Sequence, residues 1–333
     1  MTRETRHFCT YFDHRFLSRG LALHHSLLEH CPSFHLWVLC LDEPVHDELL
    51  GLSLPHVTLV PLSELEADDS ELLKVKGGRT RVEYYFTCTP AWPLWLFNHA
   101  PHLYMITYLD ADLFFFADPA PIFEELGERS VGIISHRFPS SMRWRECYGI
   151  YNVGWVSFRR DENGIACLRW WRERCIEWCH DRQETGRFGD QKYLDVWPEL
   201  FDGVAVLKHP GANVAPWNLA CHTLNCVDGR VMSCGLPLIF FHFHGLRRVW
   251  RWLVDPNLGT YGSRITPVFR RYVLMPYLVC LRTTATTAED ALPAGGRDMN
   301  AGRHLWLRWL KSAAAVLLGL LRGTITVWIG RGA

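Results

Sequence analysis

The sequence lacks the features that mark a membrane-spanning or exported chain. In its C-terminal tail the longest uncharged apolar run, Ser312 to Leu321, has ten residues, whereas a membrane-spanning helix needs about 20. The N-terminal stretch from Met1 to Phe12 is charged and has no long apolar core, so it is not typical of a signal peptide. We therefore expect a cytoplasmic protein.

The chain also lacks an excess of charge of either sign and a cysteine framework. Its 35 Lys and Arg residues balance 35 Asp and Glu residues, so no overall field favours nucleic acid as a partner. The 12 cysteines are scattered, and Cys175 and Cys179 do not form the tighter, twice-repeated pairs of a zinc site. Reduced thiols without an export signal again indicate the cytoplasm.

What the sequence does contain is an alternation of strand-like and helix-like segments. Strand patterns occupy residues 7–12, 34–41, 57–60, 104–109, 131–135, 153–158, 204–207 and 238–243. Helix patterns occupy residues 17–30, 82–98, 161–181 and 191–200, with an interruption of the second helix expected at Pro90 and Pro93. This alternation predicts an α/β fold with a mostly parallel sheet flanked by helices.

The most informative stretch runs from Tyr108 to Phe116. The apolar run from Tyr104 to Leu109 predicts a buried strand, and Asp110 and Asp112 follow it. In open α/β sheets, ligands bind beyond the carboxyl ends of the strands. Two carboxylates buried there need a partner. A hard divalent cation suits them, and it can in turn hold a diphosphate.

Two other interpretations of the Asp pair compete with the metal site. An isolated Asp-x-Asp is common in solvated turns, because Asp favours turns, but here the flanking residues on both sides are apolar. A phosphohydrolase could use the first Asp as a covalent nucleophile. Its motif has Thr or Val two residues after the second Asp, where this chain has Phe114, and this departure argues against it.

Further clusters accompany the Asp pair in a characteristic order. They are Thr10-Tyr11-Phe12-Asp13, Tyr151-Asn152-Val153-Gly154, Asp190-Gln191 and Phe240-Phe241-His242-Phe243-His244-Gly245. Over about residues 6 to 250, the chain resembles GT-A-fold glycosyltransferases. The resemblance is to the retaining glycogenin-like and bacterial galactosyltransferase-like branch, and to uncharacterised bacterial relatives. It implies a Rossmann-like GT-A sheet and transfer of a sugar.

The resemblance implies a metal site formed by Asp110, Asp112 and His242. Asp110 and Asp112 match the Asp-x-Asp motif that holds Mn²⁺ and the donor's diphosphate and ribose, and His242 matches the third ligand. Imidazole beside two carboxylates suits Mn²⁺ better than Ca²⁺, and Mg²⁺ is the alternative ion. For His244 we expect a supporting position, because alternate strand residues face alike only if the strand stays regular.

The resemblance also implies positions that contact the donor. The wall around the nucleotide base matches Thr10, Tyr11 and Asp13; the donor-sugar side matches Asn152 and Gly154; Asp190 and Gln191 match a pair near the anomeric carbon. Arg79 or Arg81 lies where the family has a basic residue over the donor. The family's Lys-Pro-Trp after His-Gly is absent, and Arg247 or Arg248 could replace its diphosphate contact.

Several of these residues also have ordinary structural interpretations. Asn152 could be a turn amide. Asp190 could cap a helix N-terminus, and Asp13 could cap the helix that starts near Leu17. A pair of histidines on a strand, such as His242 and His244, is more often packed or exposed than bound to a metal, although imidazole is the commonest metal ligand.

The combined interpretation is a metal-dependent transferase that uses a nucleotide-diphosphate sugar, expected to be a UDP-sugar, and a glycan or lipid-linked hydroxyl acceptor. The resemblance implies retention at the anomeric carbon. One alternative is a sugar-phosphate nucleotidyltransferase, but residues 8–13 lack its Gly-rich basic loop. Another is a non-catalytic membrane-surface adaptor with the same fold, against which the intact Asp110, Asp112 and His242 argue.

Three segments are expected to follow the transferase domain. We predict a transferase domain at residues 1–250, a helical extension at 251–281, a linker at 282–302 and a basic amphipathic helix at 303–333. The basic residues of that helix favour binding to an anionic membrane surface, such as the inner face of the plasma membrane. The alternative is a helix that packs on the domain or on a sister chain.

Overall fold

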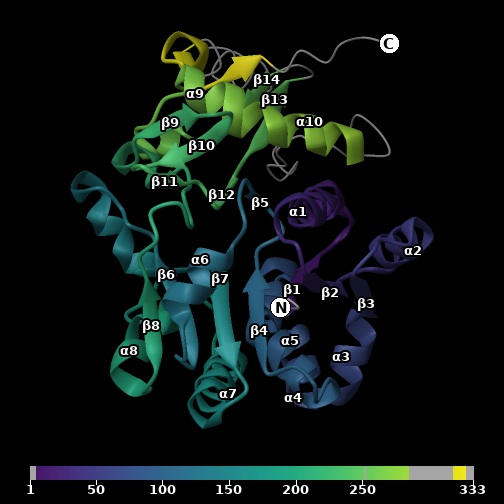
Figure 1. The fold of residues 1–333 in the computed structure, drawn as a ribbon. Helices are drawn as coiled ribbons and strands as arrows, with labels where there is room; N and C mark the ends of the chain where they lie inside the picture. Colours follow the sequence, from purple (N-terminus) through teal and green to yellow (C-terminus); the bar gives the residue numbers. More distant parts are fainter. Residues whose placement is uncertain (1–4, 251–252, 285–317, 328–333) are drawn as a thin grey trace, which may run out of the picture.

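The computed structural model describes residues 5–250, 253–284 and 318–327. Within them, seven strands form a central sheet in the order β3-β2-β1-β4-β7-β6-β8 (Figure 1). These strands are β1 (Arg6–Phe12), β2 (Phe34–Cys40), β3 (Val57–Pro61), β4 (Met105–Leu109), β6 (Val131–Ser135), β7 (Tyr151–Arg159) and β8 (Val204–Leu207).

The sheet is mostly parallel, with one reversed strand near its middle. β1 pairs in parallel with β2 and β4, β2 with β3, and β6 with β8, whereas β7 is antiparallel to both β4 and β6. The predicted α/β fold with a mostly parallel sheet flanked by helices is therefore confirmed. The amino end of β7 lies at the same edge as the carboxyl ends of β1, β4 and β6.

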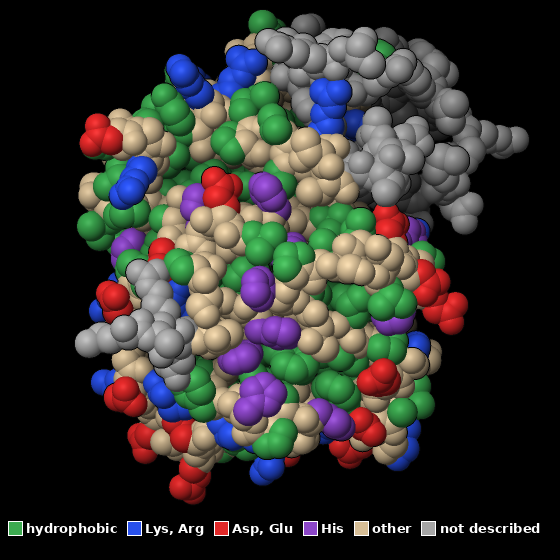
Figure 2. All heavy atoms as spheres, turned by 45° about the vertical axis from the view of Figure 1, so that its right-hand side comes forward, with side chains coloured by type: hydrophobic (Ala, Val, Ile, Leu, Met, Phe, Trp, Pro, Cys, Tyr) green, Lys and Arg blue, Asp and Glu red, His purple; other side chains and the backbone are tan. Residues whose placement is uncertain are grey.

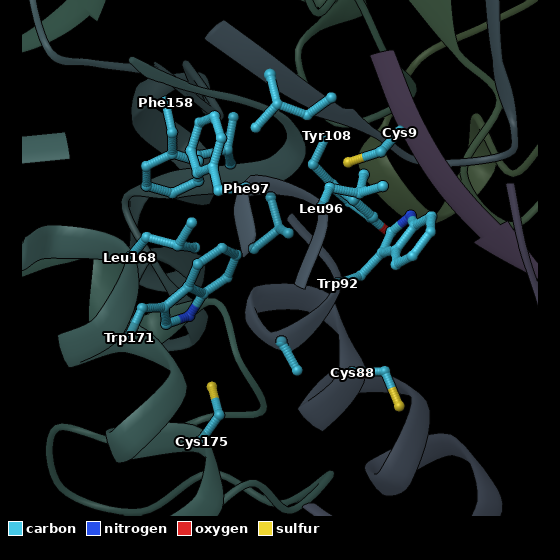
Figure 3. Packing of buried hydrophobic residues seen from close by; sticks show 14 of the residues in the cluster. Cys9, Cys88, Trp92, Leu96, Phe97, Tyr108, Phe158, Leu168, Trp171 and Cys175 are labelled. Carbon is cyan, nitrogen blue, oxygen red and sulfur yellow. The ribbon is translucent and has the colours of Figure 1, made fainter. Parts of the chain in front are cut away.

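Helices cover both faces of this sheet. They are α1 (Leu17–His30), α2 (Glu43–Leu52), α3 (Leu62–Asp68), α4 (Ser70–Lys76), α5 (Arg81–His99), α6 (Ala120–Leu126), α7 (Glu162–Glu177) and α8 (Trp197–Leu200). One core joins α5 and α7 to the sheet, and Figure 3 shows Phe97 of α5 on the side of Leu168 and Trp171 of α7. A second core lies under α1, α2 and α6. Both faces are thus closed by apolar packing.

The expected break of the long helix at its prolines does not occur. α5 runs without interruption from Arg81 to His99, and Pro90 and Pro93 lie inside it. Each internal proline removes a hydrogen bond and costs about 3 kcal/mol. Trp92 and Leu96 are fully buried beside them, and such burial contributes about 1.5–3 kcal/mol per side chain. Packing against the sheet and α7 therefore offsets the cost of the prolines.

A smaller unit covers the carboxyl edge of the sheet. It contains two small sheets, β9 (Leu224–Val227) with β10 (Arg230–Ser233) and β11 (Leu236–Pro237), and β13 (Arg247–Trp250) with β14 (Leu253–Asp255) and β15 (Thr326–Val327). It also contains α9 (Pro267–Phe269), a π-helical turn at 270–274 and α10 (Met275–Thr284). Figure 1 places this unit above the central sheet, where α10 contacts α1. β5 (Leu113–Phe115) and β12 (Phe240–His242) form a ribbon between the two parts.

The C-terminal segments differ in part from the sequence prediction. α10 continues to Thr284, so the first residues of the predicted linker are helical; residues 285–302 lie outside the described chain. Of the predicted tail helix, the structure describes residues 318–327, in which β15 pairs with β14 and the Ile265 N–H donates to the Gly323 carbonyl at 2.8 Å. This part therefore packs on the domain. No helix within the described ranges is long and apolar enough to span a membrane.

Candidate active site

The Asp pair lies in a tight turn at the carboxyl edge of the sheet. β4 ends at Leu109, and the Asp110 carbonyl accepts a hydrogen bond from the Leu113 N–H at 3.2 Å. The Asp110 N–H donates to the Gly154 carbonyl of β7 at 3.1 Å. Asp110 and Asp112 are thereby fixed where the first parallel strands end, which is where this class of sheet binds ligands.

His242 reaches the Asp pair because β12 pairs with the strand that follows the turn. His242 lies opposite Leu113, and the Phe243 N–H donates to the Asp112 carbonyl at 2.9 Å. His242 Nε2 is 3.0 Å from Asp112 Oδ1 and 3.5 Å from Asp110 Oδ2. One ligand atom from each of the three residues lies within 4.8 Å of the others. The fold thus brings the predicted ligand triad together.

The electrostatics of this triad fit a divalent cation. Burial raises the pKa of Asp110, His242 opposes this rise, and Asp112 adds to it. Burial also favours the neutral form of Asp112, but the facing imidazole holds the pKa of Asp112 at about 2. Burial lowers the pKa of His242, yet the two carboxylates outweigh it and raise that pKa. Two crowded acids thus attract positive charge, and a metal ion would supply it through the same atoms.

Asn152 connects the triad to the opposite wall of the site. Its Oδ1 accepts from the Gly154 N–H at 3.1 Å and lies 3.3 Å from His242 Nδ1. Its Nδ2 lies 3.4 Å from His136 Nε2 and donates to Gln191 Oε1 at 3.4 Å. His136 Nδ1 in turn faces a backbone carbonyl. The amide therefore places a proton on His242 Nδ1 and leaves Nε2 for a metal ion.

Gly154 provides the space for this arrangement. A Cβ atom at Gly154 would lie 2.7 Å from Asn152 Oδ1 and 2.8 Å from two ring atoms of His242. The pairing of β6 with β7 shifts register between Ile133 and Ile134, so Gly154 lies in the irregular part of β7 between Asn152 and Val156. Any larger residue would push the amide and the imidazole apart.

Asp190 is buried and lines the same cleft as Asp110 and His242. Its side chain is 7% exposed and bonds to Thr89, whose Oγ1 also lies 2.9 Å from the Tyr11 hydroxyl. Burial raises the pKa of Asp190 to about 7, Thr89 partly opposes the rise, and the nearby Asp110 adds to it. Asp190 does not cap the short helix after it, which has Gln191 at its N-cap. A carboxyl group that titrates near neutrality at this position is typical of a functional site.

Gln191 closes the wall next to Asn152. Its Nε2 donates to the Tyr148 carbonyl at 3.0 Å, while its Oε1 accepts from Asn152. Gly149, which has a φ of +139°, leaves room for it, because a Cβ there would lie 3.0 Å from Gln191 Cγ. The predicted pair Asp190 and Gln191 thus lines the cleft together with Asn152.

The residues expected around the nucleotide base occupy different environments. Tyr11 lines the cleft. Asp13 accepts from the Arg15 N–H at 3.1 Å and caps the short helix that precedes α1, which agrees with its structural interpretation. Arg81 Nη1 lies 3.8 Å from Asp13 Oδ2. Thr10 is completely buried and is not among the described residues that line the cleft.

The other arginines expected near the donor form structural contacts. Arg79 donates to Thr87 Oγ1 and, at 2.6 Å, to the Ile176 carbonyl, so it joins α5 to the end of α7. Arg247 pairs with Asp255 at 2.9 Å on the exposed β13–β14 hairpin, and Arg248 lies on the same hairpin. Neither Arg79 nor Arg247 lies among the described residues that line the cleft.

Asp110, His242, Asn152 and Asp190 face one cleft of about 510 Å³. Its walls include six side chains that the sequence did not single out: Phe86, His136, Arg145, Phe188, Trp217 and Tyr261. His136 directly follows β6, so its position at the carboxyl end of a strand could have identified it as a residue of the cleft. The others come from helices and loops that meet only in the folded chain. His244 also lines the cleft but is not part of the triad.

Comparison with known proteins identifies two similar chains from Bacillus subtilis strain 168. No family model matches this chain. It is 36% identical to the uncharacterised protein YfnD over 292 residues, which cover 87% of this chain and 93% of YfnD. It is 40% identical to the uncharacterised protein YfnF over 253 residues, which cover 74% of this chain and 83% of YfnF. The chain belongs to the family of YfnD and YfnF.

Solved structures similar to this member of the YfnD and YfnF family are glycosyltransferases. The galactosyltransferase LgtC, in complex with donor and acceptor sugar analogues, gives a TM-score of 0.47 at 16% identity, over 73% of this chain and 89% of LgtC. Mouse xyloside xylosyltransferase 1 gives a TM-score of 0.47 at 15% identity, over 73% of this chain and 98% of the xylosyltransferase. The glycosyltransferase GlyE of Streptococcus pneumoniae gives a TM-score of 0.46 at 16% identity, over 89% of this chain and 66% of GlyE.

Proposed function

We propose that this protein is a metal-dependent glycosyltransferase. It transfers a sugar from a nucleotide-diphosphate sugar, a UDP-sugar in the first instance, to a hydroxyl of a glycan or lipid-linked acceptor. The observation that carries the proposal is the convergence of Asp110, Asp112 and His242 within 4.8 Å at the carboxyl edge of the sheet. The ordered motifs that these residues share with GT-A-fold glycosyltransferases add support.

Asp110, Asp112 and His242 would hold the metal ion, with Mn²⁺ preferred and Mg²⁺ as the alternative. When bound, the ion supplies a Lewis acid that stabilises the departing diphosphate. The protein's own contribution is to fix the ligand atoms before the donor arrives. Asn152 orients the imidazole, and the backbone bonds of Asp110 and Asp112 fix the turn. Such preorganisation lowers the cost of assembling the site.

The donor sugar would lie against the wall made by Asn152, Asp190 and Gln191. Below about pH 7 a buried Asp190 keeps its proton, so it can donate a hydrogen bond rather than act as a charged nucleophile. We propose that Asp190 and Gln191 steady an oxocarbenium-like state while the acceptor hydroxyl attacks from the leaving-group face. This course retains the anomeric configuration. A proton spectrum of fresh product from an α-linked donor would show a β-linked product if the proposal were wrong.

We propose that the nucleotide base lies on Tyr11, which lines the cleft. Tyr11 is fixed through Thr89 to the buried Asp190, so its ring is held in place for stacking. Arg81 is 48% exposed on its side chain, and it is therefore a better candidate than Arg79 for a contact over the donor.

Binding to an anionic membrane surface is a separate proposal, supported by the basic residues Arg303, Arg308 and Lys311. These residues lie outside the described chain. Each basic residue near an anionic surface contributes about 1 kcal/mol. Replacing all three by Gln should reduce co-sedimentation with phosphatidylserine vesicles while leaving β15 in place. Unchanged sedimentation, or none in the unaltered protein, would remove this proposal.

The direct test of the function is a screen of UDP- and GDP-sugars for hydrolysis in the presence of Mn²⁺. Many transferases slowly pass their sugar to water, so the acceptor need not be known. The expected result is release of UDP from at least one UDP-sugar, which an excess of chelator abolishes. If the protein instead joins a nucleoside triphosphate to a sugar phosphate with release of pyrophosphate, it is a nucleotidyltransferase.

A further inference from the structure

The cleft contains one cation whose role the proposed function does not explain. Among the described residues that line it, Arg145 is the sole Lys or Arg, whereas Asp110, Asp181 and Asp190 are acidic. Arg145 comes from a 3-10 helix at Ser140–Tyr148, in the connection between β6 and β7. The sequence motifs gave no indication of it, because this segment carries none of them.

Arg145 is held by aromatic rings on the wall that also carries His242. Its guanidinium carbon lies 4.9 Å from the ring centre of Tyr261 and 4.7 Å from that of Trp144. The Tyr261 ring is 6.4 Å from Trp217, which packs edge-on against His242 at 5.0 Å. Stacking of this kind orients a guanidinium but leaves its N–H groups free for an anion.

No protein anion neutralises Arg145 within the described part of the chain. No carboxylate there lies within the 4.0 Å of an ion pair, and its Nε is buried without a hydrogen-bond acceptor. Arg143, two residues earlier, is different: it is 70% exposed and lies 3.8 Å from Glu146. A buried donor without an acceptor destabilises the folded chain. Arg145 therefore has the properties of a residue that binds an anionic ligand.

The charges in the cleft indicate which ligand this is. Asp110 and Asp112 together balance the two charges of a divalent ion, so the metal centre is neutral as a group. A nucleotide diphosphate then brings about two negative charges that the metal centre does not balance. We propose that Arg145 binds the diphosphate of the donor and supports the leaving group. This inference rests on the proposed function.

The charge on the diphosphate rises during transfer. The bond between the anomeric carbon and the phosphate oxygen breaks, and its electron pair stays on the phosphate. The acceptor oxygen forms the new bond to carbon and releases its proton to the departing phosphate or to water. Arg145 would therefore bind the leaving diphosphate more tightly than the intact donor, which is the condition for accelerating the reaction.

The test compares UDP and uridine as ligands of the full-length protein in Mn²⁺. Loss of a charge-assisted hydrogen bond of about 1.5–3 kcal/mol corresponds to a fall in affinity of about 10- to 100-fold. Arg145→Gln should lower the affinity for UDP by this factor and change the affinity for uridine by no more than about twofold. Arg145→Lys should recover part of the loss, because it restores the charge without the planar fork. The matched control Arg143→Gln should bind UDP normally.

The outcomes separate this inference from the proposed function. If the unaltered protein does not bind UDP in Mn²⁺, the proposed function itself fails. If it binds UDP and Arg145→Gln binds equally well, Arg145 does not contact the diphosphate and the inference is wrong. If Arg145→Gln weakens uridine and UDP alike, the residue maintains the shape of the cleft, and the inference is again wrong.

Discussion

Asn152 Oδ1 lies 3.3 Å from Nδ1 of His242, which is 90 residues away in the sequence. The same amide donates toward His136 and Gln191, so both of its ends are engaged. An amide held in this way can face the imidazole only with its oxygen. The bond therefore selects the tautomer of His242 that carries its proton on Nδ1 and leaves the lone pair of Nε2 toward Asp110 and Asp112. Asn152 thus acts as a positioning residue for the proposed metal site.

Replacing Asn152 should weaken metal binding without removing a ligand. In Asn152→Ala the imidazole loses the group that orients it, and loss of such a partner costs about 10- to 100-fold in metal affinity. Asn152→Asp keeps an oxygen for His242 Nδ1 and should lose less. Titration of Mn²⁺ followed by electron paramagnetic resonance measures both. Equal affinity in Asn152→Ala and the unaltered protein would show that this contact does not position the ligand.

The two histidines of the late strand should behave differently in the same titration. His242→Ala removes a ligand and should lower Mn²⁺ affinity more than Asn152→Ala does. His244→Ala should have a smaller effect, since His244 lines the cleft outside the triad. A larger loss in His244→Ala would mean that the other imidazole binds the ion.

Gly154→Ala should damage both stability and the metal site. Its Cβ would lie 2.7–2.8 Å from Asn152 and His242, and overpacking of this kind costs about 1–3 kcal/mol of unfolding free energy. Gly51→Ala in α2 is the matched control, because nothing lies within 4 Å of its Cβ. That change should be neutral or stabilising by up to about 1 kcal/mol. Urea denaturation reports the stabilities, and the account fails if the two variants behave alike.

Asp190 should make the metal-free protein less stable as the pH rises. Its pKa is about 7 in the folded chain and about 3.9 when unfolded. Between these values the folded state keeps a proton that the unfolded state releases, so stability falls from about pH 4 to pH 7 and then levels off. The effect is on the order of a few kcal/mol.

Asp190→Asn should remove this dependence, because the amide does not titrate. Urea midpoints at pH 5 and pH 8, measured in chelator, give the comparison. The variant should gain stability relative to the unaltered protein at pH 8 more than at pH 5. An equal difference at both pH values would show that Asp190 has an ordinary pKa.

Histidines whose pKa is lowered by burial should have the opposite effect on stability. Figure 2 shows histidine side chains gathered on the face turned forward. Burial lowers the pKa of His24, and the nearby His25 and His56 lower it further. Burial also lowers the pKa of His35, with smaller contributions from His56 and His102. Below about pH 6.5 the unfolded chain therefore takes up protons first, and stability is lost as the pH falls. His24→Gln should reduce the loss between pH 7 and pH 5; an unchanged loss contradicts this explanation.

The fold was largely predictable because local patterns and tertiary packing agree. Leu17–His30 is one helix with the predicted ends, and Val131–Ser135 is one strand with the predicted ends. The helices at Glu43–Leu52 and Ser70–Lys76 were missed, since each buries few side chains and their apolar patterns are short. The uninterrupted α5 could not be predicted, because packing of its neighbours outweighs the local effect of Pro90 and Pro93.

The grouping of Asp110, Asp112 and His242 was predictable because each residue belongs to a motif with a characteristic place in the order of strands. The assignment of Arg247 or Arg248 to the diphosphate could not be tested by spacing alone: Arg247 pairs with Asp255 on a hairpin whose register depends on residues much later in the chain. Arg145, Trp217 and Tyr261 were missed for a related reason. They meet only when the β6–β7 connection and the C-terminal unit close over the sheet.

The most direct test of the central claim is a calorimetric titration of UDP into the full-length protein, once in Mn²⁺ and once in excess chelator. Asp112→Asn serves as the variant that loses one ligand and keeps the side-chain volume. We predict binding in Mn²⁺, little or no binding in chelator, and a weakening of at least about tenfold in Asp112→Asn. UDP binding of equal strength with and without the metal would contradict the account of this site.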